Sequence, residues 1–264
     1  MPGFDQKKAY ATQEEVFFDD GREIELLHFI YNKPDVDEIR GSPQRVLAAV
    51  DEFARTKKYL MNVELGGYIG YSCVLFGDAV RKAGGKRYFS LERNPEFGAV
   101  ISSLVDLAGL GDVVKVVVGS SDASIKRLHA SGDLKHIDMM FLDHYKPAYK
   151  TDLKLCEELK LVSPGSVLAA DNVIKPGNPP YLEYVRASVA EKKKALETGA
   201  NENGPDARFQ DKTAKQYAKR QGDERLEATS GNPNLVYDSK LVNSYEPTGE
   251  EDGVEITRCV GEES

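Results

Sequence analysis

The sequence has no excess of positive charge and no long apolar run. Its 264 residues carry 35 Lys and Arg against 43 Asp and Glu, a formal net charge of −8. Nonspecific binding to nucleic acid needs a basic surface instead. No stretch approaches the roughly 18 consecutive apolar residues of a membrane-spanning helix. We therefore expect neither a nucleic-acid partner nor a membrane partner.

Cysteine is also scarce. The three cysteines, Cys73, Cys156 and Cys259, are far apart and odd in number, which fits neither a disulfide framework nor the ligand spacing of a zinc site. Residues 1–20 contain early acidic residues and lack the apolar core of a secretory signal. These features predict reduced thiols in a cytoplasmic protein.

Strand-like apolar runs alternate with amphipathic helical patterns along most of the chain. Ser42 and Pro43 are a typical helix start. Helices are predicted over 21–31, from 42 onward, over 71–83, from 94 to the stop at 109, and over 122–129, 149–161 and 181–196. Strands are predicted over 86–92, 113–118, 137–143 and 166–171. This alternation predicts an α/β fold whose mostly parallel sheet has helices on both faces.

The C-terminal part has a different pattern. Residues 235–242 and 254–260 are strand-like with no helix between them, which predicts an antiparallel pair at one edge of the sheet. Residues 191–232 are highly charged with few large apolar side chains, as in an exposed, mobile insertion. We expect an N-terminal extension with a helix over 1–40 and one domain over 41–264.

A glycine-rich turn precedes one predicted helix. The segment Glu64-Leu-Gly-Gly-Tyr-Ile-Gly70 lets the backbone approach a ligand and directs helix N–H groups toward it. It is not the dinucleotide motif G-x-G-x-x-G, and a plain tight turn is the alternative. Glu92 ends the next predicted strand, where an acidic residue binds ribose hydroxyls in nucleotide-binding folds. The alternative for Glu92 is a surface glutamate.

Polar residues follow two further strands. One strand ends in Asp143-His144-Tyr145-Lys146 and the next in Asp171-Asn172. Ligands of open α/β sheets bind beyond the carboxyl ends of the strands, and oxygen donors of this kind suit Mg²⁺. Lys146 is a candidate general base, because a lysine near a divalent cation can take that role. The alternatives are that each aspartate caps a helix and that Lys146 is a surface lysine.

Three ordered motifs together resemble the catechol O-methyltransferase family. They are Glu64–Ser72 (ELGGYIGYS), Phe141–Lys146 (FLDHYK) and Ala170–Gly177 (ADNVIKPG). The resemblance runs from about residue 41 to residue 260, apart from the charged insertion. It implies a Rossmann-like class I methyltransferase fold with a seven-stranded sheet and an antiparallel last strand. It also implies methyl transfer from S-adenosylmethionine to a hydroxyl of a catechol, with Mg²⁺.

The resemblance also implies site residues. The donor-binding set is Val63, Gly66, Tyr68, Ser72, Glu92, Ser121, Asp143 and His144; the metal ligands are Asp143, Asp171 and Asn172. The catalytic pair is Lys146, which takes the hydroxyl proton, and Glu246, which holds the second hydroxyl. The substrate-binding set is Tyr59, Met61, Tyr145, Asn172, Pro176 and Glu246. Tyr59, Tyr145 and Pro176 match the apolar residues that surround the catechol ring in the family. Two of these positions are Trp in mammalian members, whereas this chain has no Trp. The shape of the substrate is therefore expected to differ.

One departure from the family lies between Val63 and Glu64, which are adjacent here. Family members have about twenty more residues at this point, roughly one helix plus one strand at average lengths. Residues 59–65 must therefore supply both a connection and the first strand, each of which normally needs several residues. Two outcomes are open. Residues 59–65 form the first strand and displace Met61 and Val63 from donor and substrate, or the first strand is short and supports the sheet poorly.

The expected function is Mg²⁺-dependent methylation of a catechol-like small molecule. One alternative is an inactive relative whose deletion impairs donor binding, and another is a methyltransferase for other phenolic substrates. A nicotinamide-dependent oxidoreductase explains the glycines and Glu92 but leaves the polar residues after the other strands without a role. A monomer is the favoured oligomeric state.

Overall fold

The computed structural model describes residues 21–56, 67–198 and 229–263. The chain forms two compact units. The first comprises Met1–Ser124 with Pro247–Gly249, and the second comprises Ile125–Glu246 with Glu250–Ser264. In the described residues, no helix is both long and apolar enough to cross a membrane. All three cysteines are buried, and none of them forms a disulfide within the described residues.

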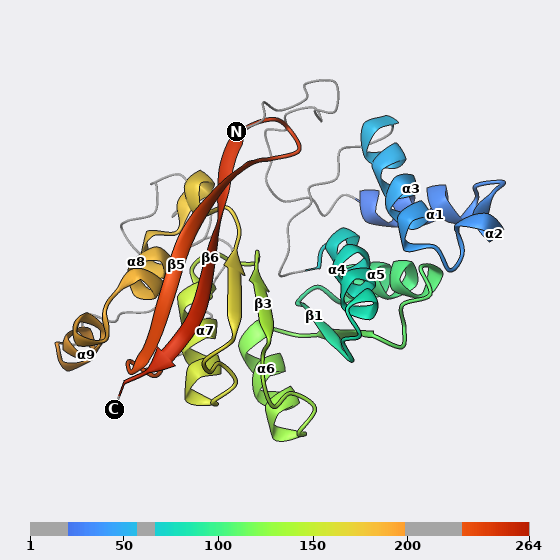
Figure 1. Ribbon diagram of the computed structural model, residues 1–264. Helices are drawn as coiled ribbons and strands as arrows, with labels where there is room; N and C mark the ends of the chain where they lie inside the picture. The colour runs from blue at the N-terminus through green and yellow to red at the C-terminus, as the bar shows by residue number, and fades with distance from the viewer. Residues whose placement is uncertain (1–20, 57–66, 199–228, 264) are drawn as a thin grey trace. The chain divides into compact units, whose positions relative to one another are not determined.

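The first unit packs helices against a short parallel sheet (Figure 1). Its elements are α1 (Arg22–Tyr31), α2 (Val36–Ile39), α3 (Pro43–Thr56), α4 (Tyr71–Lys82), β1 (Tyr88–Glu92), α5 (Pro95–Leu107) and β2 (Val114–Val118). Strands β1 and β2 pair in parallel from Tyr88↔Val114 to Glu92↔Val118. Asn94 caps α5 by accepting a hydrogen bond from the Glu96 N–H, and Pro95 follows at the first helical position.

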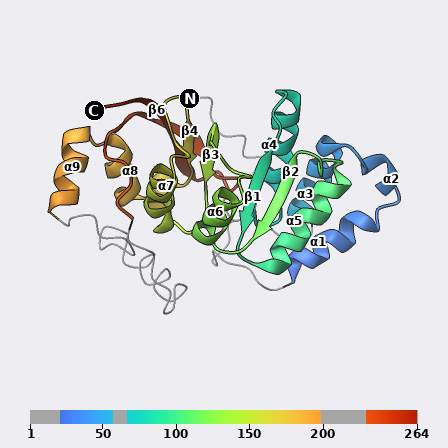
Figure 2. The same ribbon diagram turned by 90° about the horizontal axis from the view of Figure 1, so that it is seen from below.

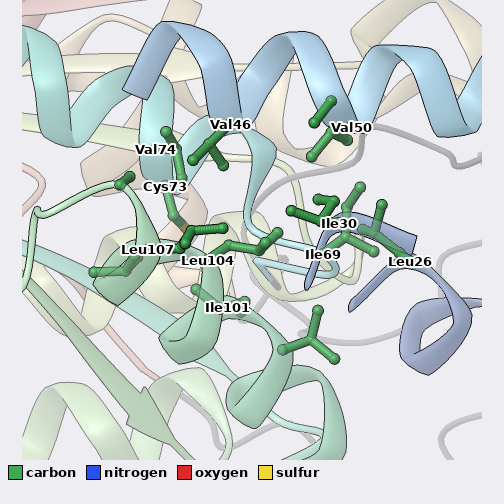
Figure 3. Packing of buried hydrophobic residues seen from close by; sticks show 14 of the residues in the cluster. Leu26, Ile30, Val46, Val50, Ile69, Cys73, Val74, Ile101, Leu104 and Leu107 are labelled. Atoms are coloured by element: carbon green, nitrogen blue, oxygen red, sulfur yellow. The ribbon is translucent and has the colours of Figure 1, made fainter. Parts of the chain in front are cut away.

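The core of this unit lies between four helices (Figure 3). Helix α3 packs on α4 and α1 packs on α5. Leu26 and Ile30 come from α1, and Ile101 and Leu104 from α5; all four are fully buried. Burying side chains of this size stabilises a fold by about 1.5–3 kcal/mol each. This core supports the turn that precedes α4.

The second unit is built around a four-stranded sheet. Its elements are β3 (Met139–Leu142), α7 (Ala148–Glu158), β4 (Val167–Ala170), a π-helical turn (Val173–Gly177), α8 (Pro179–Arg186), α9 (Val189–Glu197), β5 (Leu235–Tyr245) and β6 (Glu251–Glu262); helix α6 (Ser121–Ala130) contains the boundary between the units. The strand order is β3-β4-β6-β5. Strands β3 and β4 are parallel, and β6 is antiparallel to both of its neighbours. Helices α7 and α8 lie on one side of this sheet (Figure 2).

The predicted antiparallel C-terminal pair and antiparallel last strand are confirmed by β5 and β6. The single helix predicted over 181–196 is wrong, because the chain forms α8 and α9 with a break at Ala187 and Ser188. Ser188 starts α9 through a capping box, in which its side chain accepts from the Glu191 N–H and the Glu191 carboxylate accepts from the Ser188 N–H. This cap stabilises a new helix start in place of a continuous helix.

Both ends of the charged segment 191–232 have defined structure. Residues 191–197 belong to α9, and the Lys192 side chain is buried and donates to the Leu235 carbonyl. At the other end, the backbone N–H groups of Ser230 and Gly231 donate to Glu158, and the Asn232 N–H donates to Glu157. These ends are anchored to the second unit.

The described residues carry six strands in two separate sheets. Residues 59–65, predicted to supply the first strand of a seven-stranded sheet, lie within 57–66, outside the described residues. The alternation of helices and strands on either side of that segment matches the prediction.

Candidate active site

The glycine-rich turn in the first unit leads directly into α4. Gly70 is the residue before the helix and has φ +79°, a conformation that favours glycine. A Cβ atom on Gly70 would lie 3.1 Å from Ile101 Cγ2, and one on Gly67 would lie 2.6 Å from Ile101 Cδ1. Tyr68 between them also has a positive φ, of 35°. The turn therefore depends on glycine both for its conformation and for its packing on α5.

Gly70→Ala is expected to lower the free energy of unfolding by about 1–3 kcal/mol. The substitution strains the left-handed backbone and also crowds Ile101. Gly84→Ala is the matched control, because Gly84 has φ +76° but nothing within 4 Å of its Cβ position. Urea unfolding of both variants measures the difference. Equal losses would show that the contact with Ile101 contributes nothing.

Glu92 lies at the carboxyl end of β1, beside the glycine turn. Its side chain is buried, with a residue exposure of 5%, so the alternative of a surface glutamate is wrong. One carboxylate oxygen accepts from the Tyr68 N–H at 3.2 Å and the other accepts from the Asn94 N–H at 2.7 Å. The carboxylate thus joins the glycine turn to the start of α5, at the position where the sequence predicts a ribose-binding acid.

The first turn of α4 presents a second polar feature. The Ser72 hydroxyl is buried and has no hydrogen-bond partner within the described part of the chain. The first N–H groups of a helix also lack intrahelical acceptors and attract anionic groups. A buried hydroxyl without a partner at such an end fits an amino-acid portion of a bound cofactor. Ser121, at the start of α6, is half-buried.

Four predicted site residues cannot be placed. Tyr59, Met61, Val63 and Gly66 lie outside the described residues.

In the second unit, predicted metal ligands and the predicted base are in direct contact. Asp143 follows β3, and Lys146 lies in the turn before α7. The Lys146 ammonium donates to Asp143 Oδ1, to Asn172 Oδ1 and to the Tyr149 hydroxyl, each at 2.7 Å. Lys146 is 5% exposed, so the alternative of a surface lysine is wrong. The buried Asn178 amide donates to the Lys146 carbonyl at 2.8 Å and fixes its backbone.

Asn172 connects Lys146 to the carboxylates of Glu246 and Asp252. It follows β4 with φ +56°, a left-handed conformation that asparagine tolerates better than most residues. Its side-chain nitrogen donates to Glu246 Oε1 at 2.7 Å and to Asp252 Oδ2 at 3.0 Å. Asp171 is half-buried, and its Oδ1 accepts from the Asn172 N–H at 2.9 Å. The predicted residues Asp143, Lys146, Asp171, Asn172 and Glu246 therefore lie together.

The cluster carries more negative than positive charge. Burial, together with the neighbouring carboxylates of Asp171, Asp252 and Asp143, raises the pKa of Glu246 to about 8. Burial also raises the pKa of Asp171, and the charge of Asp252 adds to this effect. Burial is the main cause of both raised pKa values, and the neighbouring carboxylates add to it.

His144 and Tyr149 lie beside Lys146. The His144 ring stacks on the Tyr149 ring with centroids 5.0 Å apart. His144 Nε2 lies 2.7 Å from Asp152 Oδ2, and its Nδ1 is buried without a hydrogen-bond partner in the described residues. The Tyr149 hydroxyl also donates to the Asp171 carbonyl at 3.3 Å. Tyr149 therefore connects the predicted base Lys146, the predicted ligand Asp171 and the predicted donor-binding residue His144.

Sequence analysis missed Tyr149 and Asp252 as site residues. Tyr149 lies in the first turn of α7, and its hydroxyl accepts from Lys146 in the turn before that helix. Asp252 is the second residue of β6, the strand that is antiparallel to β4, so it lies near the end of β4. Tyr145 and Pro176, assigned to the substrate, are both half-buried, and Pro176 lies in the turn after Asn172.

Several donor atoms of this cluster suit a hard cation. No group of three or more His, Cys, Asp or Glu side chains arranged to hold a metal occurs in residues 21–56, 67–198 and 229–263. The predicted set has two carboxylates and one amide instead. Asp143 Oδ1 and Asn172 Oδ1 already bind the same cationic group, the Lys146 ammonium. Asp143 does not cap α7, whose N-cap residue is Pro147. These oxygen donors fit Mg²⁺.

The chain is similar in sequence to known methyltransferases. The family model "Methyltransferase domain" matches residues 63–173. The Sus scrofa catechol O-methyltransferase is 42% identical over 137 residues, which cover 52% of this chain and 73% of that protein. The chain belongs to the catechol O-methyltransferase family. The family membership confirms the α/β methyltransferase fold predicted from the motifs.

The chain is also similar to another catechol O-methyltransferase and to a solved O-methyltransferase structure. The Bos taurus catechol O-methyltransferase is 39% identical over 171 residues, which cover 57% of this chain and 62% of that protein. This chain thus spans less than two thirds of the length of several catechol O-methyltransferases that it matches. The solved structure of the O-methyltransferase from Bacillus cereus in complex with SAH is 18% identical. It aligns over 92% of this chain and 93% of that chain, with a TM-score of 0.48.

Proposed function

We propose that this protein transfers a methyl group from S-adenosylmethionine to one hydroxyl of a catechol-like small molecule, with Mg²⁺. The observation that carries the proposal is the contact of Lys146 with both Asp143 and Asn172, next to Glu246. This arrangement combines a candidate base, hard oxygen ligands and a second carboxylate. A nicotinamide-dependent oxidoreductase has no use for such a set, whereas a catechol methyltransferase uses every member.

Three residues would hold the metal, and two would act on the hydroxyls. Asp143, Asp171 and Asn172 would bind Mg²⁺, which when bound would orient two adjacent hydroxyl oxygens and make one of them more acidic. Lys146, in its neutral amine form, would accept the proton of the attacking hydroxyl and become the ammonium. Glu246 would accept a hydrogen bond from the second hydroxyl, which requires a substrate with two neighbouring hydroxyl groups. The methyl group would come from the donor's sulfonium.

The residues around the glycine turn would bind the donor. Glu92 would accept hydrogen bonds from the ribose hydroxyls while it also holds the turn at Tyr68. The helix start at Ser72 would face the amino-acid portion of the donor. This assignment rests on the family resemblance, on the burial of Glu92 and on the unpartnered Ser72 hydroxyl.

Glu92→Gln is expected to weaken binding of S-adenosylhomocysteine about tenfold, since hydrogen bonds to a charged group contribute about 1.5–3 kcal/mol. Glu96→Gln is the control, because this substitution removes the same charge from the exposed first turn of α5. Titration calorimetry measures both dissociation constants. If both variants bind alike, Glu92 has no role in donor binding.

The substrate class is tested by comparing catechol with 2-methoxyphenol and phenol in a labelled-methyl transfer assay with Mg²⁺. The proposal predicts transfer to catechol and a kcat/KM at least about tenfold lower for the two compounds with a single hydroxyl, because both lack the hydroxyl that would donate a hydrogen bond to Glu246. Phenol also lacks the second oxygen ligand. Transfer to all three at similar rates would contradict the assignment of Glu246 and favour a methyltransferase for other phenols.

A further inference from the structure

Asp252 lies next to the candidate metal ligands without being one of the predicted set. The antiparallel register pairs Ala170 of β4 with Glu255 of β6, so the start of β6 lies beside the residues that follow β4. Asp252 is only 2% exposed. A buried carboxylate is costly unless its oxygens accept hydrogen bonds, and the partners of Asp252 therefore indicate what it does.

The carboxylate of Asp252 holds the turn that follows Asn172. Its Oδ1 accepts from the N–H groups of Ile174 and Lys175 at 3.1 Å each, and from its neighbour Gly253 at 2.7 Å. This turn starts at the left-handed residue Asn172, whose φ of +56° persists only when surrounding contacts support it. Asp252 supplies such contacts on two successive residues.

The second oxygen of Asp252 fixes the orientation of the Asn172 amide. Oδ2 accepts from the amide nitrogen, as Glu246 does, while the amide oxygen accepts from Lys146. The reversed amide would place its NH2 group against the Lys146 ammonium and its oxygen against two carboxylates. The hydrogen-bond network therefore requires the amide oxygen, which is the metal-binding atom, to face Asp143 and Lys146.

We propose that Asp252 is a positioning residue for the metal site. It presents the oxygen of Asn172 to the cation, and it does not bind the metal itself. The inference rests on the proposed function, in which Asn172 is a ligand. Residues that orient metal ligands in this way typically change metal affinity by about 10–100-fold when they are replaced.

The test is a titration of the full chain with Mn²⁺, in which electron paramagnetic resonance measures the bound and free ion. Asp252→Asn is expected to weaken Mn²⁺ binding about 10–100-fold. Glu251→Gln removes the same charge from the preceding residue, which is exposed, and is expected to bind Mn²⁺ nearly as the wild type does. Circular dichroism and thermal unfolding establish that each variant is folded. If D252N does not unfold cooperatively, D252E replaces it, because it keeps the charge and moves the carboxylate.

A double-mutant cycle separates positioning from direct ligation. If Asp252 acts through Asn172, D252N in an Asn172→Ala background causes no further loss of Mn²⁺ affinity. A further 10-fold loss in that background would show that Asp252 is itself a ligand and would overturn the inference. Equal binding by D252N and E251Q would also overturn it. Absence of Mn²⁺ binding by the folded wild type would instead contradict the proposed function.

Discussion

Lys146→Met is expected to lower kcat for catechol methylation by a factor of about 10²–10⁴, the usual contribution of a general base. The variant keeps an unbranched side chain that is one atom shorter, and it has no group that accepts a proton. The ammonium of Lys146 binds the same two oxygens that would bind the metal, Asp143 Oδ1 and Asn172 Oδ1. Its removal should therefore leave Mn²⁺ affinity equal to or greater than that of the wild type.

The control is Lys135→Met, which removes the same charge from an exposed residue of the second unit. Steady-state kinetics and Mn²⁺ titration are compared for the two variants. If K146M keeps more than about a third of the wild-type kcat, Lys146 is not the base, since general-base catalysis contributes at least about 100-fold. Loss of Mn²⁺ binding together with activity would show that Lys146 maintains the structure of the cluster.

Asp171→Ala has the second large expected effect. It removes one of two carboxylates that would hold the cation, and a catalytic metal stabilises the transition state by several kcal/mol, which corresponds to about 10³-fold in rate. The residual activity of the variant should no longer respond to EDTA. Labelled-methyl transfer with and without EDTA measures both quantities.

Asp138→Ala is the control for this loss, because the Asp138 side chain is 99% exposed and lies just before β3. It is expected to keep wild-type activity and EDTA sensitivity. Full activity of D171A would contradict the proposed metal site. A loss that Mg²⁺ at high concentration restores would show that Asp171 contributes to affinity alone.

The order of helices and strands was predictable because its determinants are local. Asn94 and Pro95 mark the start of α5, and the β-branched run 113–118 forms β2. The start of α9 was missed although Ser188 and Glu191 form the S-x-x-E pattern of a capping box. The single helix predicted over 181–196 is wrong because this local cap starts a new helix within the segment.

The candidate site was only partly predictable. The carboxyl ends of parallel strands lie at one edge of a sheet, so the proximity of Asp143 to Asn172 followed from the strand pattern. The π-helical turn 173–177 did not follow, because its geometry depends on Asp252, some eighty residues away in sequence. The role of Tyr149 as a shared partner also depends on tertiary contacts that the spacing alone does not define.

Whether this protein methylates catechol in a Mg²⁺-dependent reaction is tested most directly with the unmodified chain. After its folding is established by circular dichroism, labelled-methyl transfer from S-adenosylmethionine to catechol is measured with Mg²⁺, with excess EDTA, and after Mg²⁺ is restored. The account predicts transfer that EDTA abolishes and Mg²⁺ restores. Absence of transfer from a folded chain, or transfer that EDTA does not affect, would contradict it.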